Sequence, residues 1–270
     1  MTQWTKKNMP SLPYAFSVDK AWIQVFPSKL AASQAAANKA STILKARILE
    51  HGRVRVIVGT GSSQADLINA LVHDEQVDWS RVEVFHMDEY VGLPEDHPAS
   101  FRRWLRTHLA DLAHPKVTHY LNADAHDLAV EARRYGELLC SAPIDLCFLG
   151  FGENGHIAFN DPHVADFNDP LIIKRVDLDE RCRRQQVGEG AFADTEAVPR
   201  DALSITCPVL LSAKYVVCCV PELRKAEAVR NALKGPVSES CPASIVRTHP
   251  HAFIFLDRDS ASLLFQQEER

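Results

Sequence analysis

The segment from Gly150 to Pro162, GFGENGHIAFNDP, places an imidazole, an amide and a carboxylate in one glycine-rich stretch. It directly follows the apolar run 144–149. Open α/β sheets build their ligand sites from polar loops at the carboxyl ends of buried parallel strands. Asn154 and Asp161 lie close enough in sequence to contact His156, and a carboxylate on one ring nitrogen leaves the other nitrogen free for acid–base chemistry. We predict a catalytic segment, the alternative being a structural loop.

Two other chemistries fit this segment less well. An acyl-transfer triad needs a nucleophile, and no serine of the chain lies in a GxSxG turn. A metal site needs further ligands, and the nearest other histidine, His163, follows a proline outside any HExxH or CxxC pattern. We therefore expect no metal.

A second polar loop, GTGSS at 59–63, lies between the β-branched run 54–58 and a helical pattern. Its small residues let backbone N–H groups approach an anion, and a helix N-terminus adds about 0.3–1 kcal/mol for an exposed charge. It has neither the Gly-Lys-Ser/Thr of a P-loop nor GxGxxG, so a nucleotide is not indicated. The alternative is an ordinary turn with Ser62 or Ser63 as the helix N-cap. The predicted phosphate ligands are Thr60, Gly61, Ser62 and Ser63.

A third polar pair, Asp88 and Glu89, follows the strand pattern 82–87. A carboxylate at a strand end can act as the general base for a carbon acid, contributing roughly 10²- to 10⁴-fold to the rate. Partial desolvation would raise the pKa of such a base toward the working pH. We predict this role for Asp88 and substrate binding for Glu89, the alternative being a solvated turn. His86 is expected to be a structural histidine.

The elements that must position these loops alternate between strand and helix. Such an order implies parallel strands joined by right-handed crossovers, so the three loops should share one edge of one sheet. We predict a single α/β, Rossmann-like domain over 29–270, with a mostly parallel sheet flanked by helices on both faces, after an irregular segment over 1–28. Strands are expected at 54–58, 82–87, 144–149, 203–206, 215–220 and 252–256, and helices at 36–48, 67–72, 101–112, 127–140 and 222–234.

The composition excludes several classes of protein. The net charge is −5 and its acids and bases are interspersed, so no basic stripe indicates nucleic acid. The chain shows no signal-peptide core and no apolar run long enough to span a membrane. Seven cysteines without a ligand-like CxxC pair are typical of reduced core thiols in a cytoplasmic protein.

Taken together, these motifs resemble the glucosamine-6-phosphate deaminase (isomerase) family, a branch of the group that includes 6-phosphogluconolactonases. The resemblance covers about residues 30–260, and the ending IAFN after Gly-His favours the deaminase side. The motifs that carry it are TGSS at 60–63, MDEYVGL at 87–93 with His97-Pro98, GxNGHIAFNDP at 152–162, Ala202-Leu203 and Lys225-Ala226.

The resemblance implies a role for each motif. Asp88 would move a proton between C2 and C1 of an amino-sugar phosphate, and His156, flanked by Asn154 and Asp161, would assist ring opening. The loop 59–63 and Lys225 would hold the 6-phosphate. Glucosamine 6-phosphate would give fructose 6-phosphate and ammonia without a metal or organic cofactor, because the substrate nitrogen stabilises the intermediate.

The chain departs from the family pattern in three places. Asn154 stands where an aspartate is common, and Asp161 where a glutamate is common. Gln186 falls where the family often supplies an arginine to the phosphate, so Arg183 and Arg184 are alternative ligands. The segment HVADFNDP at 163–170 also lacks a Gly/Ser-rich loop, and we predict no activation by N-acetylglucosamine 6-phosphate.

Other functions stay open on the sequence. A related substrate such as galactosamine 6-phosphate fits the same motifs. A 6-phosphogluconolactonase would use His156 as a general base on water, and a sugar-phosphate sensor would bind without turnover. The sequence leaves open a homo-oligomer and the role of 163–200, which could form a lid.

Overall fold

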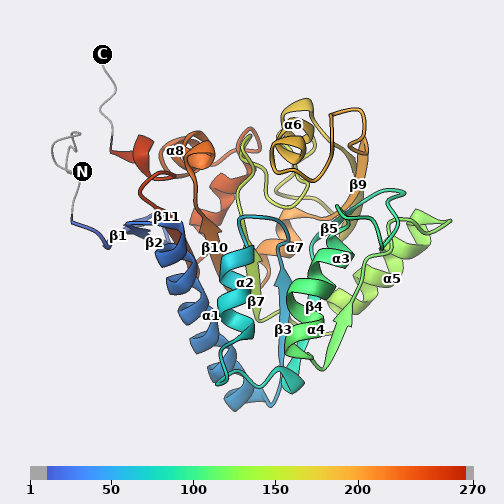
Figure 1. The fold of residues 1–270 in the computed structure, drawn as a ribbon, viewed down its shortest axis with the longest axis horizontal. Coiled ribbons are helices and arrows are strands. Elements are labelled where there is room, and N and C mark those ends of the chain that lie inside the picture. Colours follow the sequence, from blue (N-terminus) through green and yellow to red (C-terminus); the bar gives the residue numbers. More distant parts are fainter. Residues whose placement is uncertain (1–10, 266–270) are drawn as a thin grey trace.

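The computed structural model describes residues 11–265 and has an eight-stranded sheet at its centre (Figure 1). The strand order is β1-β2-β11-β10-β7-β3-β4-β6, and every neighbouring pair is parallel except β1 with β2. This confirms the predicted α/β class. The strands are β1 (Tyr14–Val18), β2 (Ala21–Phe26), β3 (Val54–Val58), β4 (Val82–His86), β6 (Val117–His119), β7 (Leu146–Leu149), β10 (Tyr215–Val220) and β11 (Ala252–Asp257).

Helices cover both faces of this sheet, and alternate residues of β3 show the two sides. Ile57 packs in one apolar cluster with α5, α7 and α8, whereas Val56 and Val58 pack in another with α1, α2 and α3. A strand buried on both faces favours the continuous β-branched run that β3 has. The helices are α1 (Lys29–His51), α2 (Ala65–Val72), α3 (Phe101–Leu105), α4 (Asp111–Ala113), α5 (Leu128–Cys140), α6 (Glu180–Gly188), α7 (Cys207–Leu211) and α8 (Ala226–Lys234).

Short helical turns complete these layers. The predicted helix over 101–112 is split, because a π-helical turn separates α3 from α4. A 3₁₀ turn just before α8 contains Lys225. The shorter turns are η2 (Trp79–Arg81), η3 (Arg106–Ala110), η4 (Leu223–Lys225), η5 (Pro242–Thr248) and η6 (Ser262–Leu264).

A second, antiparallel sheet lies with α6 beyond the carboxyl ends of the central strands (Figure 1). Its order is β5 (Asp88–Tyr90), β9 (Asp201–Ile205) and β8 (Ile173–Asp177). The strand predicted at 203–206 therefore exists, but it belongs to this smaller sheet. Its register pairs Asp88 with Ser204, so the backbone of the proposed base is part of a ladder.

The prediction of an irregular segment over 1–28 is wrong for the part that the structure describes. Residues 14–26 form the β1–β2 hairpin, and β2 pairs in parallel with β11 at the edge of the central sheet. Ala21, Ile23 and Val25 are buried, with polar or aromatic residues between them, which is the period-2 pattern of a strand. Residues 1–10 lie outside the described residues.

The cysteines and the helices bear on two further predictions from the sequence. All seven cysteines are unpaired and six of them are buried, as expected for core thiols. Within residues 11–265, none of the helices has the length and apolar character needed to span a membrane.

Candidate active site

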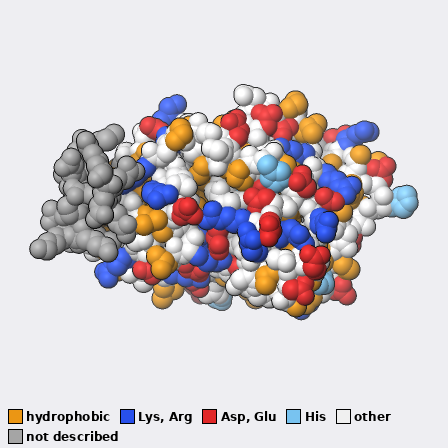
Figure 2. Space-filling model, turned by 90° about the horizontal axis from the view of Figure 1, so that it is seen from above, with side chains coloured by type: hydrophobic (Ala, Val, Ile, Leu, Met, Phe, Trp, Pro, Cys, Tyr) orange, Lys and Arg blue, Asp and Glu red, His pale blue; other side chains and the backbone are white. Residues whose placement is uncertain are grey.

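The three polar loops meet at one cavity, because β7, β3 and β4 are neighbours that run in the same direction. The carboxyl ends of parallel strands lie on one edge of a sheet. Figure 2 views the molecule from the side of this edge, where acidic and basic side chains are interspersed across the middle. The predicted site residues that line the cavity are Thr60, Gly61, Ser63, Asp88, His156 and Lys225.

Asp88 presents a buried carboxyl group to this cavity. Asp88 is 5% exposed and lines the cavity. Burial, together with the charge of Glu89, raises the pKa of its carboxyl group well above the usual value. No group of residues 11–265 donates a hydrogen bond to its side chain. A desolvated carboxylate that faces a cavity without a partner fits a general base.

His156 is held by Asp161 from behind. The distance from His156 Nδ1 to Asp161 Oδ1 is 2.9 Å, and Asp161 is fully buried. Burial by itself raises the pKa of Asp161, but the contacts of His156 and Asn154 and the backbone N–H of Asp179 outweigh it and lower that pKa. An ionised Asp161 keeps Nδ1 protonated, so Nε2 is the nitrogen left for substrate.

Asn154 supports this arrangement without lining the cavity. Its Nδ2 donates to Asp161 Oδ1 (2.8 Å) and to Asp179 Oδ2 (2.7 Å), while its Oδ1 accepts from the His156 backbone N–H (3.0 Å). Asp161 does not line the cavity either. Both residues, predicted as catalytic, are therefore positioned to orient His156 rather than to touch a substrate.

The same region contains groups at metal-ligand distances. One is His156, Asp161 and Cys182, and another is Asp161, His163 and Asp179. The oxygens of Asp161 already accept from Asn154 and from the Asp179 N–H, and burial raises the pKa of the Cys182 thiol well above its usual value. A cysteine binds a metal as its thiolate, so His156, Asp161 and Cys182 fit a hydrogen-bonded support for the histidine better than a metal centre.

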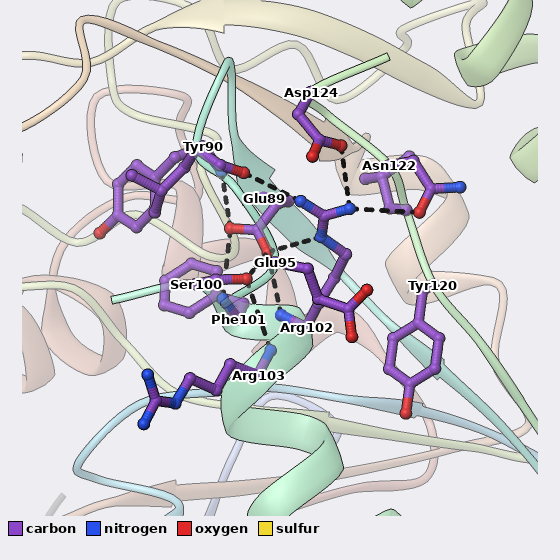
Figure 3. A network of polar contacts seen from close by, with 12 residues as sticks. Glu89, Tyr90, Glu95, Ser100, Phe101, Arg102, Arg103, Tyr120, Asn122 and Asp124 are labelled. Carbon is purple, nitrogen blue, oxygen red and sulfur yellow. Dashed lines mark hydrogen bonds and ion pairs between the residues drawn. The ribbon is translucent and has the colours of Figure 1, made fainter. Parts of the chain in front are cut away.

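Glu89, predicted as a substrate ligand, does not line the cavity. Successive side chains of β5 point to opposite sides, which sends Asp88 toward the cavity and Glu89 into the protein. Figure 3 shows its fully buried carboxylate against the start of α3, where it accepts from Ser100 Oγ at 2.8 Å. Its backbone donors are Tyr90, Phe101 and Arg102.

His86 is a structural histidine, as predicted. Nδ1 lies 2.9 Å from the carbonyl oxygen of Asp88, and Nε2 accepts the backbone N–H of Leu121 at 2.9 Å. Burial lowers its pKa to about 3, so the ring is neutral at physiological pH. It fixes the backbone at the proposed base without entering the cavity.

The loop 59–63 contributes small and polar groups. Gly61 has φ +110°, a left-handed conformation that favours glycine. Neither Ser62 nor Ser63 is the N-cap of α2, because the helix begins after Gln64, whose side chain forms no capping hydrogen bond. Ser62 does not line the cavity, and its hydroxyl donates to Glu189 instead.

Lys225 is a buried cation at the same cavity. It is 2% exposed, and burial lowers its pKa to about 8. Within residues 11–265 its ammonium group has no hydrogen bond or ion pair, although the charge of Glu189 raises its pKa against the effect of burial. A desolvated ammonium group without a counterion fits a site for an anion.

Of the three residues that could replace the family arginine, only Gln186 lines the cavity. Arg183 donates to the backbone carbonyl oxygens of Thr195 and Val198, and Arg184 pairs with Glu180 on the surface. Helix α6 thus supplies an amide where an arginine was expected.

Sequence reasoning missed four residues around this end of the cavity. Gln64, Gln185 and Glu189 line it, and Arg224 binds Glu189. The only sequence signal that could have identified Arg224 was its position next to Lys225. Glu189 and Gln185 come from the long segment whose role the sequence left open.

Comparisons with known proteins agree with this geometry. The model of the family described as glucosamine-6-phosphate isomerases/6-phosphogluconolactonase matches residues 27–254. A glucosamine-6-phosphate deaminase of Bacillus cereus (strain B4264) is 37% identical over 206 residues, covering 76% of this chain and 76% of that protein. A deaminase of Bacillus anthracis (strain CDC 684 / NRRL 3495) matches at the same identity and coverage.

Solved structures show the same fold. A monomeric glucosamine-6-phosphate deaminase superposes with a TM-score of 0.82 and 29% identity, covering 89% of this chain and 99% of that one. A 6-phosphogluconolactonase from Trypanosoma brucei gives a TM-score of 0.73 at 18% identity, covering 93% and 100%. The second likeness is one of fold alone. The chain belongs to the glucosamine-6-phosphate isomerase/6-phosphogluconolactonase family.

Proposed function

We propose that this protein is an isomerising deaminase that converts glucosamine 6-phosphate to fructose 6-phosphate and ammonia. The observation that carries the proposal is the placement of Asp88, His156 and the unpaired Lys225 around one cavity. The identity of 37% to curated deaminases supports the reaction class. Seven unpaired cysteines support a cytoplasmic location.

His156 acts first in the proposed sequence. With Nδ1 directed at Asp161, its Nε2 takes the proton of the anomeric hydroxyl and passes it to the ring oxygen, so that the bond between C1 and the ring oxygen breaks and C1 becomes an aldehyde. General acid–base assistance of this kind contributes roughly 10²- to 10⁴-fold. Asp161 and Asn154 keep the ring of His156 in the required orientation and tautomer.

Asp88 then acts on the open chain. Its carboxylate removes the C2 proton and becomes a carboxylic acid, while the electrons of the C–H bond form the C1=C2 double bond and the C1 oxygen takes up a proton from water, which gives an enolamine. The carboxylic acid of Asp88 then gives a proton to C1, which forms the imine of fructose 6-phosphate, and water converts the imine to the ketone and ammonia. A carboxyl group with a raised pKa is suited to both halves of this transfer, because it holds the proton between the two steps.

The phosphate lies at the loop 59–63 and Lys225 in this proposal. The ammonium group supplies the charge, and the backbone of Gly61 and the hydroxyls of Thr60 and Ser63 supply neutral donors. Gln186 supplies a neutral amide where family members often have an arginine.

The test is a substrate panel with purified protein. Ammonia release is measured for glucosamine, galactosamine and mannosamine 6-phosphates, with hydrolysis of 6-phosphogluconolactone alongside. We expect the highest kcat/KM for glucosamine 6-phosphate. Asp88→Asn should remove both ammonia release and exchange of the C2 proton with solvent.

Three other outcomes of this panel would each contradict the proposed function. Preference for the galactosamine ester would change the substrate, lactone hydrolysis without ammonia release would change the reaction class, and binding without turnover would indicate a sensor. Added N-acetylglucosamine 6-phosphate should leave the rate curve unchanged.

A further inference from the structure

Glu189 places a carboxylate of the protein itself at the anion end of the cavity. It follows the last turn of α6, and its side chain is only 13% exposed. Oε1 accepts from Arg224 Nη1 at 2.7 Å and from Gln185 Nε2 at 2.8 Å, and Oε2 accepts from Ser62 Oγ at 3.0 Å. Both oxygens therefore have donors of the kinds that bind phosphate oxygens.

This carboxylate lies at the mouth of the glycine loop. A Cβ atom placed on Gly61 would be 3.9 Å from Glu189 Oε2, and the charge of Glu189 acts on Lys225. Ser62 and Arg224 thus bind a carboxylate of the protein, and the charge of Lys225 acts on the same group.

The end of α6 and neighbouring carboxylates also act on the charge of Glu189. The C-terminal end of a helix carries partial negative charge, which disfavours a glutamate there. Arg224 is also shared, because it pairs with Glu222 at 2.6 Å and with Glu153 at 3.5 Å. Lys29 also pairs with Glu222, at 2.8 Å. Burial by itself raises the pKa of Glu189, but the charges of Lys225 and Arg224 outweigh it and lower that pKa, so Glu189 is an ionised carboxylate that shares Arg224 with two others.

We propose that Glu189 is an internal competitor for the substrate phosphate, which binds by taking Ser62 and Arg224 from the Glu189 carboxylate. The inference rests on the proposed function, since it takes a phosphorylated ligand at this end of the cavity. A phosphoryl dianion has more charge and more acceptor oxygens than a carboxylate, so it displaces Glu189 from shared donors. Glu189 thereby sets the affinity for phosphorylated ligands, and Arg224 is the second phosphate cation beside Lys225.

The first variant is Glu189→Gln, which keeps the shape of the side chain and removes its charge. We expect KM for glucosamine 6-phosphate and the Ki of inorganic phosphate to fall by about five- to tenfold, the effect of one like charge a few ångströms away in a partly solvated cavity. The kcat should stay within about twofold, because the phosphate end is separate from Asp88 and His156. Glu189→Ala should lower the same two constants.

A matched control separates local from general charge effects. Glu227→Gln removes one carboxylate from an exposed pair with Arg181 and should leave KM and Ki unchanged. Arg224→Met tests the other half of the proposal and should raise KM by about tenfold or more, as expected for loss of a charged hydrogen bond to phosphate. Thermal unfolding of each variant establishes that it is folded.

Calorimetric titration with inorganic phosphate measures the affinity of the anion end of the cavity without any turnover, so it tests this inference separately from the proposed function. Tighter phosphate binding by Glu189→Gln supports the inference even if the wild type releases no ammonia from any hexosamine phosphate, a result that would overturn the proposed reaction alone. Unchanged or weaker phosphate binding by both Glu189 variants would overturn the inference, whatever the activity of the wild type.

Discussion

A Cβ atom placed on Gly152 would lie 2.2 Å from Cε1 of His156, because the backbone of Gly152 packs against the imidazole. The Gly152 N–H also donates to the His156 carbonyl oxygen at 2.9 Å. The glycine is therefore needed for close approach, and the position of the catalytic ring depends on the absence of a side chain beside it.

Gly152→Ala should move His156 away from its place at the cavity. We expect kcat to fall by about 10²-fold or more, as for loss of a positioned acid–base group. Steady-state ammonia release measures the effect. The control is Gly188→Ala in α6, where an added Cβ meets nothing within 4 Å and should stabilise the helix by about 0.5–1 kcal/mol. Normal kcat in Gly152→Ala would contradict a role for the ring in its present position.

Asp88→Asn should make the protein more stable at neutral pH while it removes activity. The pKa of Asp88 is raised in the folded state by burial, so folding disfavours the ionised form. Below the unfolded pKa the group is protonated in both states. As pH rises toward the raised folded pKa, only the unfolded chain releases the proton, and the wild type loses stability.

The gain of Asp88→Asn should therefore be absent near pH 4 and reach about 1–3 kcal/mol at pH 8. Urea unfolding at several pH values measures it. Asp96→Asn, at an exposed position, should show no such trend. A gain that is equal at pH 5 and pH 8 would rule out the raised pKa as its cause.

Asn154→Asp should destabilise the protein even though aspartate is common there in the family. The Asn154 amide donates to both Asp161 and Asp179, so an aspartate would place three carboxylates together without those donors. We expect a loss of about 2–4 kcal/mol in the free energy of unfolding at pH 8, and a smaller loss at pH 5, where one carboxyl group can be protonated. Asn154→Ala, which adds no charge, should lose less at pH 8. A larger loss for Asn154→Ala than for Asn154→Asp at pH 8 would contradict this account.

Glu89→Ala should cost stability through the start of α3. Its removal leaves buried donors unsatisfied, namely the Ser100 hydroxyl and the Phe101 and Arg102 N–H groups shown in Figure 3, at about 3–5 kcal/mol in total. Glu95→Ala, which breaks an exposed pair with Arg106, should cost less than about 1 kcal/mol. Urea unfolding compares the two. Equal losses would show that the network does not stabilise the fold.

The convergence of the three loops could be predicted because it depends on local patterns and strand direction. An apolar run followed by a glycine-rich polar loop marks the carboxyl end of a strand, and crossover handedness puts such ends on one edge. Asp88 and His156 were therefore identifiable as members of one site.

The remaining features depend on contacts that local patterns do not encode. A shift of one residue in a strand reverses the side to which a side chain points, so Glu89 could not be separated from Asp88 by its type. Ser62 forms its hydrogen bond with Glu189, which lies far along the chain. The β1–β2 hairpin was missed because its alternation is short and contains aromatic and polar residues on the outer side.

The pairing of β2 with β11 also constrains when the sheet can be completed. β2 pairs with its hairpin partner β1 and with β11, which is the last strand in sequence among residues 11–265. During synthesis the apolar side chains of β2 therefore remain without their final neighbours until residues 252–257 emerge. Two strands that are more than 200 residues apart in the sequence thus complete this side of the sheet only after the later one has been synthesised.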